Sequence, residues 1–80
     1  MAKIIFYGPN GEYHYGNLKE GGKLHAYGPN GEFWHGKLRD GGRIQFYDSK
    51  GNYYYGKLKE GGKIALFDEN GEYYHGKLKD

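Results

Sequence analysis

Short runs of alternating apolar and polar residues recur along the chain, and glycine-rich segments separate them. In the first twenty residues the runs span 3–7 and 12–19, and both are rich in the β-branched and aromatic residues that favour strands. The segments between runs, such as Gly-Pro-Asn-Gly at 8–11 and Glu-Gly-Gly at 20–22, are typical of tight turns. Neither connector can hold a crossover helix, so consecutive strands should be antiparallel neighbours. The pattern predicts an all-β, eight-stranded antiparallel up-and-down meander.

The meander is built from a 20-residue repeat that accounts for the whole chain. The four copies are 1–20, 21–40, 41–60 and 61–80, and they predict a single domain of four β-hairpins. Because the strand number is even, the last strand can pair antiparallel with the first and close a barrel without edges. We favour this closed barrel, in which residues 3–7 pair with residues 73–79, over an open twisted sheet that self-associates.

The hairpin turn determines which side chains share a face. Positions are numbered within the repeat, so that position 14 is His14 in the first copy. A four-residue turn that pairs Tyr7 with Glu12 places positions 4, 6, 13 and 15 on one face, which we predict to be buried. Positions 5, 7 and 14 then lie on the opposite face. Leu18 fits this arrangement through a β-bulge at Gly16, or by continuing a stripe in which the position-14 side chain covers the bare glycine. The sequence leaves both open.

The composition argues against helices and against catalysis. Sixteen glycines and ten tyrosines among 80 residues disfavour helices. There is no cysteine for a disulfide, a thiolate metal site or a nucleophile, threonine is absent, and the single serine, Ser49, lies in a turn. No carboxylate lies on the predicted buried face to act in an acid and base pair. We therefore expect neither enzyme activity nor a cofactor.

No segment of the sequence indicates where the protein is located or that it binds a membrane or a nucleic acid. No run approaches the roughly 20 apolar residues needed to span a bilayer, and none resembles a signal peptide. We expect a soluble protein of undetermined location, without membrane insertion. The formal net charge of +2 at pH 7 gives no reason to expect a nucleic-acid partner.

Charged residues gather at opposite ends of the predicted strands. Eleven of the twelve Lys and Arg residues lie around the Gly-Gly turns, together with the four acids at position 20, while Lys50 stands among six acids at the other end. The plainest interpretation is that these charges keep a tyrosine-rich sheet soluble and in register. The positive rim would also suit an anion, and the oppositely charged ends would allow self-association.

Four histidines raise the question of a metal site. His35 and His75 occupy the same repeat position two copies apart, and in a closed barrel they would point inward from opposite walls. No carboxylate shares their register, and histidine alternates there with tyrosine, as expected for an aromatic-sized filler with a polar tip. We expect no metal site, with His35 and His75 as the candidates if there is one.

The second half of each repeat resembles the membrane occupation and recognition nexus (MORN) repeat. Residues 71–80 follow the pattern Gly-x-x-aromatic-x-Gly-x-Leu-Lys-acid, and the MORN core reads Tyr-x-Gly-x-Trp or Leu and then Lys-x-Gly. Position 14 matches the family's tyrosine, position 16 its glycine and position 18 its leucine. Each copy is shorter than the MORN repeat, and His14 departs from its aromatic pattern.

The first half of each repeat, such as Phe-Asp-Glu-Asn-Gly at 67–71, is similar to the cell-wall choline-binding and glucan-binding repeats. Those families place tryptophans where this chain has Ile64 and Lys77. The two resemblances together imply a hairpin-repeat scaffold for binding or assembly, with no catalytic residues to carry over.

We therefore expect a structural repeat scaffold without catalytic activity, and the close repetition is also typical of a designed consensus. The alternatives are a protein–protein interaction repeat, or a small binding module for a carbohydrate or a quaternary ammonium such as choline. A binding module would use an aromatic platform made by positions 7 and 14. Its residues would be Tyr7, Tyr27, Trp34, Tyr47, Tyr54, Phe67 and Tyr74.

Overall fold

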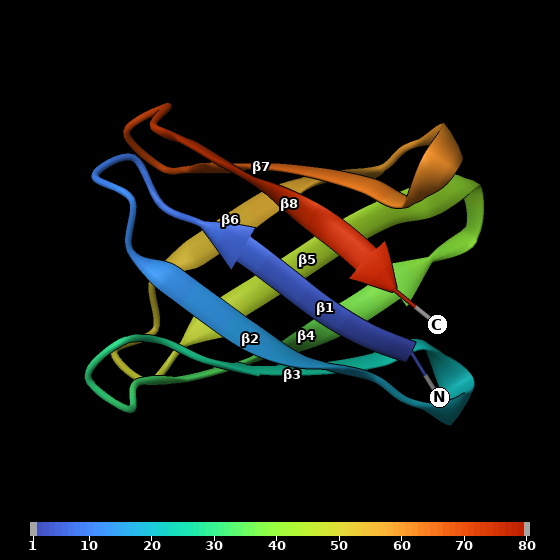
Figure 1. Ribbon diagram of the computed structural model, residues 1–80. Helices are drawn as coiled ribbons and strands as arrows, with labels where there is room; N and C mark the ends of the chain where they lie inside the picture. The colour runs from blue at the N-terminus through green and yellow to red at the C-terminus, as the bar shows by residue number, and fades with distance from the viewer. Residues whose placement is uncertain (1, 80) are drawn as a thin grey trace.

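The computed structural model describes residues 2–79, which form a closed antiparallel barrel of eight strands (Figure 1). The strands are β1 (Ala2–Tyr7), β2 (Tyr13–Leu18), β3 (Lys23–Tyr27), β4 (Phe33–Arg39), β5 (Arg43–Asp48), β6 (Tyr53–Leu58), β7 (Lys63–Asp68) and β8 (Tyr73–Lys79). Single 3-10 turns make every second connection: η1 (Glu20–Gly22) joins β2 to β3, η2 (Asp40–Gly42) joins β4 to β5, and η3 (Glu60–Gly62) joins β6 to β7. Each strand pairs with the next, so the predicted up-and-down meander is confirmed.

The first and last strands close the barrel. Residues 3–7 of β1 pair with residues 75–79 of β8, and the two strands run side by side in Figure 1. The predicted closure within one chain is therefore correct. An open sheet would leave two rows of unpaired backbone groups, and closure removes both.

The pairing advances by two residues in each repeat. Ile4 pairs with Gly16, and Gly16 pairs with Ala26, which is position 6 of the next copy. The same advance joins the last copy to the first, because Gly76 pairs with both Ile64 and Phe6. Two residues in each of four repeats give a total stagger of eight. Eight strands with this stagger tilt by about 36° to the barrel axis and leave an interior that side chains fill.

The hairpin loop contains three residues between its paired ends. The Gly8 N–H donates to the Glu12 carbonyl oxygen at 2.8 Å, and the Gly11 N–H donates to the Gly8 carbonyl oxygen at 3.0 Å. Gly11 has φ of 81°, the positive value that follows a type I turn in three-residue hairpin loops. Tyr7 consequently pairs with Tyr13, so the predicted pair of Tyr7 with Glu12 is wrong by one residue.

This one-residue difference turns the even-numbered strands over, because side chains alternate between faces along a strand. Positions 4 and 6 point inward as predicted. Positions 13 and 15 point outward, with Tyr13 44% and Tyr15 50% exposed, so their predicted burial is wrong. Leu18 reaches the interior by plain alternation, and pairing runs unbroken through Gly16, which excludes a bulge there. Positions 14, 16 and 18 do form one stripe, and it faces the core.

The core is built from equivalent positions of the four repeats. Positions 4, 6 and 14 supply its buried members, and the leucines of position 18 pack against them. Position 16 has no room for a side chain, because a Cβ on Gly16 would overlap the carbonyl oxygen of His25 on the adjacent strand. The narrow barrel, 25 × 22 × 20 Å in extent, thus brings neighbouring backbones close together at every position 16.

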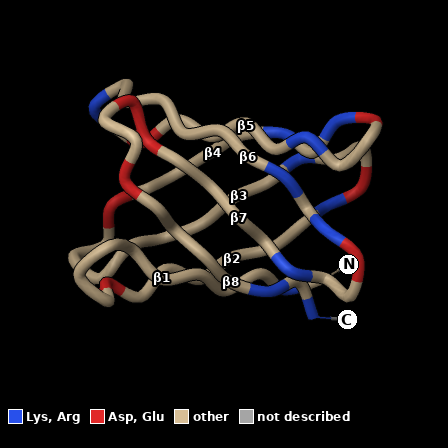
Figure 2. The backbone as a smooth tube through the Cα atoms, turned by 90° about the horizontal axis from the view of Figure 1, so that it is seen from above, with Lys and Arg blue, Asp and Glu red and all other residues tan. Residues whose placement is uncertain are grey.

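The two ends of the barrel differ in charge. Figure 2 shows Lys and Arg gathered at the end that carries η1, η2 and η3, which we call the basic end. The opposite end carries the four hairpin loops and most of the Asp and Glu residues, and we call it the acidic end.

Candidate functional site

Four position-14 side chains form a ring just inside the acidic end. The members of this aromatic ring are His14, Trp34, Tyr54 and Tyr74. Neighbouring ring centroids lie 4.7 Å apart for His14 and Trp34, 3.9 Å for Trp34 and Tyr54, and 5.4 Å for Tyr54 and Tyr74. Tyr74 and His14 complete the circuit at 6.2 Å. Phe6 stacks against His14 at 4.6 Å with an interplanar angle of 1°, so the core continues directly behind the aromatic ring.

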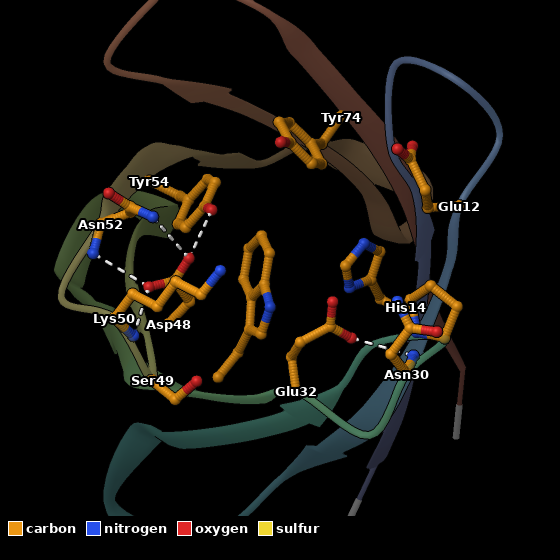
Figure 3. Close-up of a pocket in the computed structure, with 12 residues that line it drawn as sticks. Glu12, His14, Asn30, Glu32, Asp48, Ser49, Lys50, Asn52, Tyr54 and Tyr74 are labelled. Atoms are coloured by element: carbon orange, nitrogen blue, oxygen red, sulfur yellow. Dashed lines mark hydrogen bonds between the residues drawn. The ribbon is translucent and has the colours of Figure 1, made fainter.

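A cavity of about 260 Å³ opens over the aromatic ring at the acidic end. Carboxylates of Glu12, Glu32 and Asp48 contribute to its lining (Figure 3). The Glu32 and His14 side chains point toward one another across it. Aromatic rings and carboxylates in one concave site are a combination suited to organic cations.

In the first two repeats, backbone N–H groups of the hairpin turn fix the cavity carboxylate by hydrogen bonds. Glu12 Oε1 accepts a hydrogen bond from the Asn10 N–H at 3.0 Å, and Glu32 Oε1 accepts one from the Asn30 N–H at 2.9 Å. Hydrogen bonds from their own backbone N–H groups, and then from those of Asn10 and Asn30, lower the pKa of Glu12 and Glu32 below the usual value. Both groups are therefore ionised near neutral pH.

The third repeat holds its carboxylate differently, through position 8. Asp48 Oδ1 accepts hydrogen bonds from the N–H groups of Lys50 and Asn52, both at 2.9 Å. Its Oδ2 accepts from the Tyr54 hydroxyl at 2.8 Å and from Asn52 Nδ2 at 3.0 Å. Burial acts to raise the pKa of Asp48, but the hydrogen bonds from Asn52 and Tyr54 outweigh it and lower the pKa. Asp48 is thus an ionised turn cap whose oxygens are both occupied.

The two tyrosines of the aromatic ring stay neutral. Burial raises the pKa of Tyr54 far above its ordinary value, and the hydrogen bond to Asp48 adds to the effect. Burial and the charges of Asp68 and Glu72 raise the pKa of Tyr74 to about 12. Both therefore present neutral rings and hydroxyl groups at physiological pH.

His14 is the residue of the site whose polar atom lacks a partner. It is 5% exposed, and its Nδ1 has no hydrogen-bond partner among the described residues. Burial lowers the pKa of His14, although the charges of Glu32 and Glu12 oppose this. The imidazole is therefore neutral at pH 7, and with its proton on Nε2 the Nδ1 atom is a free acceptor. An unsatisfied buried polar atom costs about 1–3 kcal/mol, which a donor on a ligand would relieve.

The structure divides the predicted aromatic platform between two faces. Trp34, Tyr54 and Tyr74 come together in the aromatic ring. The position-7 members lie on the outer wall and are between 37% and 43% exposed; they are Tyr7, Tyr27, Tyr47 and Phe67. The wall separates the two groups, so the seven residues do not form one surface.

The outer wall carries a continuous belt of aromatic rings at positions 7, 13 and 15, which we call the aromatic belt. Successive ring centroids are 5.2–6.2 Å apart around the whole barrel. His35 and His75 belong to it and are exposed, so the prediction that they point inward is wrong. Within residues 2–79, no group of three or more His, Cys, Asp or Glu side chains is arranged to hold a metal.

Sequence reasoning missed Glu12, Glu32, Asp48 and His14 as parts of one site. The signal for His14 was present, because it occupies the same repeat position as Trp34, Tyr54 and Tyr74. With position 14 assigned to the outer face, however, nothing placed these rings next to the acids of the hairpin loops.

Comparisons with protein families, with curated proteins and with solved structures find no match to this chain. The resemblances to MORN and choline-binding repeats rest on the short motifs alone. Over the part of the chain that the structure describes, no helix has the length and apolarity to cross a membrane.

Proposed function

We propose that the protein is a non-catalytic binding module that takes a small organic ammonium cation at its acidic end. The observation that carries this proposal is the convergence of the aromatic ring and the Glu12 and Glu32 carboxylates on one cavity. The aromatic ring comes from four different repeats, so the site exists only in the closed barrel.

Electrostatics favour a cation over an anion or a neutral ligand. Glu12, Glu32 and Asp48 are ionised, and Lys50 is the one Lys or Arg among the described residues that line the cavity. A cation against aromatic side chains gains about 0.5–2 kcal/mol per contact, more when water is excluded. Carboxylates beside it add an attraction that salt weakens, because the cavity opens to solvent.

His14 favours a hydrogen-bonding ammonium over a quaternary one. With the proton on Nε2, its Nδ1 offers an unused acceptor, and the Glu32 carboxylate faces the same space. A primary ammonium has three N–H donors to share among such acceptors, whereas a quaternary ammonium has none.

The test is a titration followed by the fluorescence of Trp34, the single tryptophan. We expect n-butylammonium to give a saturable change, tetramethylammonium a weaker one, and n-butanol and methyl glucoside none. A saturable response to butanol equal to that of butylammonium would contradict the proposal, as would no response to any cation.

Charge variants separate the site from a general effect of the acidic end. Glu32→Gln should weaken n-butylammonium binding about tenfold, since it removes a charge at the cavity. Glu69→Gln removes the same charge from an exposed loop position outside the cavity lining and should leave affinity within about twofold. Equal losses in the two variants would show that only the overall field attracts the cation.

The second candidate is a structural scaffold that binds no small ligand. It is favoured by closure in a repeated register, which leaves every strand from β1 to β8 paired on both sides. A scaffold should give no saturable change with any of the four compounds, so the same titration decides between the two proposals.

A further inference from the structure

We propose that a second site on the outer wall, around Ala65, binds a flat aromatic anion. A groove of about 710 Å³ lies there, away from the acidic-end cavity. Its walls are rings of the aromatic belt at Tyr55, Phe67 and Tyr73, and its rim carries Arg43, Lys57 and Lys59.

The groove exists because one repeat carries a small residue at an outward position. Position 5 is Ile5, His25, Gln45 and Ala65 in the four copies. Ala65 lies between Lys57 on β6 and His75 on β8, and it is only 7% exposed because the larger neighbours rise around it. The pocket lined by Ile5 has less than half the volume, about 320 Å³. The small side chain of the fourth repeat therefore accompanies the larger of these two outer pockets.

The walls of the groove suit a planar ring. Tyr55 is 46%, Phe67 37% and Tyr73 47% exposed, so part of each ring is open. The centroids of Tyr55 and Phe67 are 6.2 Å apart at an interplanar angle of 37°, and those of Phe67 and Tyr73 are 5.4 Å apart at 44°. Tilted rings over an alanine floor offer both faces and edges to an inserted aromatic ligand.

The rim selects an anion. Arg43 lies directly opposite Lys57 on the adjacent strand, and Arg39 lies opposite Arg43. Like charges in direct cross-strand pairs destabilise a sheet, and an anion placed between them relieves the repulsion. No acidic side chain is among the described residues that line this groove.

Neighbouring hydrogen bonds keep one side of the groove in place. Arg39 Nε donates to Gln45 Oε1 at 2.7 Å, and Gln45 Nε2 donates to the Tyr53 hydroxyl at 3.3 Å. Arg39 is thereby engaged with Gln45, whereas Arg43, Lys57 and Lys59 contribute to the lining of the groove. The occupant we assign is a small planar aromatic sulfonate, carboxylate or phosphate, with its ring over Ala65 and its charge toward Lys57.

The test uses 1-anilinonaphthalene-8-sulfonate as the probe, with N-phenyl-1-naphthylamine as the analogue that lacks the sulfonate. The folded protein should bind the sulfonate at one site with enhanced probe fluorescence, and the uncharged analogue about tenfold more weakly. Equal affinity for both compounds would overturn the assignment of an anion site.

Two variants and one control locate the site. Ala65→Ile fills the groove with the side chain that the first repeat carries at this position, and should weaken sulfonate binding about tenfold. Lys57→Gln should weaken it about threefold, while Lys23→Gln, which removes the same charge from β3, should leave it unchanged. Circular dichroism and thermal melting establish that each variant is folded.

The outcomes are independent of the acidic-end site. If Ala65→Ile fails to fold, the comparison of Lys57→Gln with Lys23→Gln still shows whether sulfonate binding depends on the charge at this groove. Equal losses in those two variants, or undiminished binding to folded Ala65→Ile, would overturn the proposal. Glu32→Gln lies at the other end of the barrel and should not alter sulfonate affinity.

Discussion

Gly28 lies against Glu32 so closely that a Cβ on Gly28 would stand 2.6 Å from Glu32 Oε1 and 3.3 Å from His14 Cε1. The same relation joins Gly8 to Glu12 in the first repeat. In the third repeat, position 8 is Asp48, and its own carboxylate accepts the turn hydrogen bonds. Glycine at position 8 therefore makes room for the position-12 glutamate to reach back over the turn. Where position 8 is Asp48, the aspartate caps the turn instead, and both kinds of carboxylate line the acidic-end cavity.

Replacing Gly28 with alanine should move the Glu32 carboxylate without unfolding the barrel. The nearest atom is the end of a flexible side chain, so we expect a loss of about 1 kcal/mol, the value of one hydrogen bond. Chemical denaturation measures this loss. In a Glu32→Ala background the same substitution should cost much less, because the atom it displaces is gone. Additive costs in the double variant would refute the contact.

Replacing Gly36 with valine should be far more damaging. A Cβ on Gly36 would overlap the carbonyl oxygen of Gln45, and this backbone cannot move aside without breaking strand pairs. We expect a loss of about 3 kcal/mol or more, or no folded protein. His25→Val, at an outward position that already varies among the repeats, should cost less than about 1 kcal/mol. A Gly36→Val protein as resistant to denaturant as wild type would contradict the close approach of these strands.

Acidification should destabilise the barrel in two stages. The pKa of His14 is lowered in the fold, so the unfolded chain binds a proton first and stability falls as the pH drops below about 6.5. The pKa values of Glu12, Glu32 and Asp48 are also lowered, so their contribution is present above about pH 4.5 and is lost at lower pH. Denaturation midpoints between pH 8 and pH 3 measure both stages.

We attribute the first loss of stability to the protonation of His14, and a substitution at this residue should abolish it. His14→Tyr puts at position 14 the residue that the third and fourth repeats carry, and it does not titrate in this range. Its stability should stay level between pH 7 and pH 5.5 while the wild type declines. If stability falls equally with pH in the wild type and in His14→Tyr, the decline is caused by groups other than His14.

Removing the Tyr54 hydroxyl should lower the free energy of unfolding without changing the barrel fold. Tyr54→Phe leaves Asp48 Oδ2 without its hydroxyl donor at 2.8 Å, and we expect a loss of about 1–2 kcal/mol. Without that donor the pKa of Asp48 should rise toward its ordinary value, which the titration of its carboxyl carbon by NMR can follow. An unchanged carboxyl pKa in Tyr54→Phe would contradict the role of this hydrogen bond.

Much of the fold follows from local chemistry that a sequence displays directly. Loop segments such as Gly-Pro-Asn-Gly at 8–11 specify tight turns, and they are too short for crossover connections, so the order and direction of all eight strands were predictable. An even number of strands made closure possible, and the charged residues at the strand ends placed the acidic and basic ends correctly.

The choice of inner face was not predictable in the same way. It depends on whether Gly11 adopts a positive φ and moves the partner of Tyr7 from Glu12 to Tyr13, because a shift of one position turns a whole strand over. Glycine permits both loops equally well. The difference is decided by what the closed barrel can bury: the inner face takes Leu18 and its equivalents beside the position-14 rings.

The chain by itself determined the repeat, the strands, their order and the polarity of the two ends, because each of these depends on residues adjacent in sequence. The tertiary structure alone decided both candidate sites. His14 and Trp34 meet because closure carries four repeats around one axis, and the residues that line the Ala65 groove come together from four different strands. Such groups are distant along the chain, and only the curvature and stagger of the closed barrel set the distances between them.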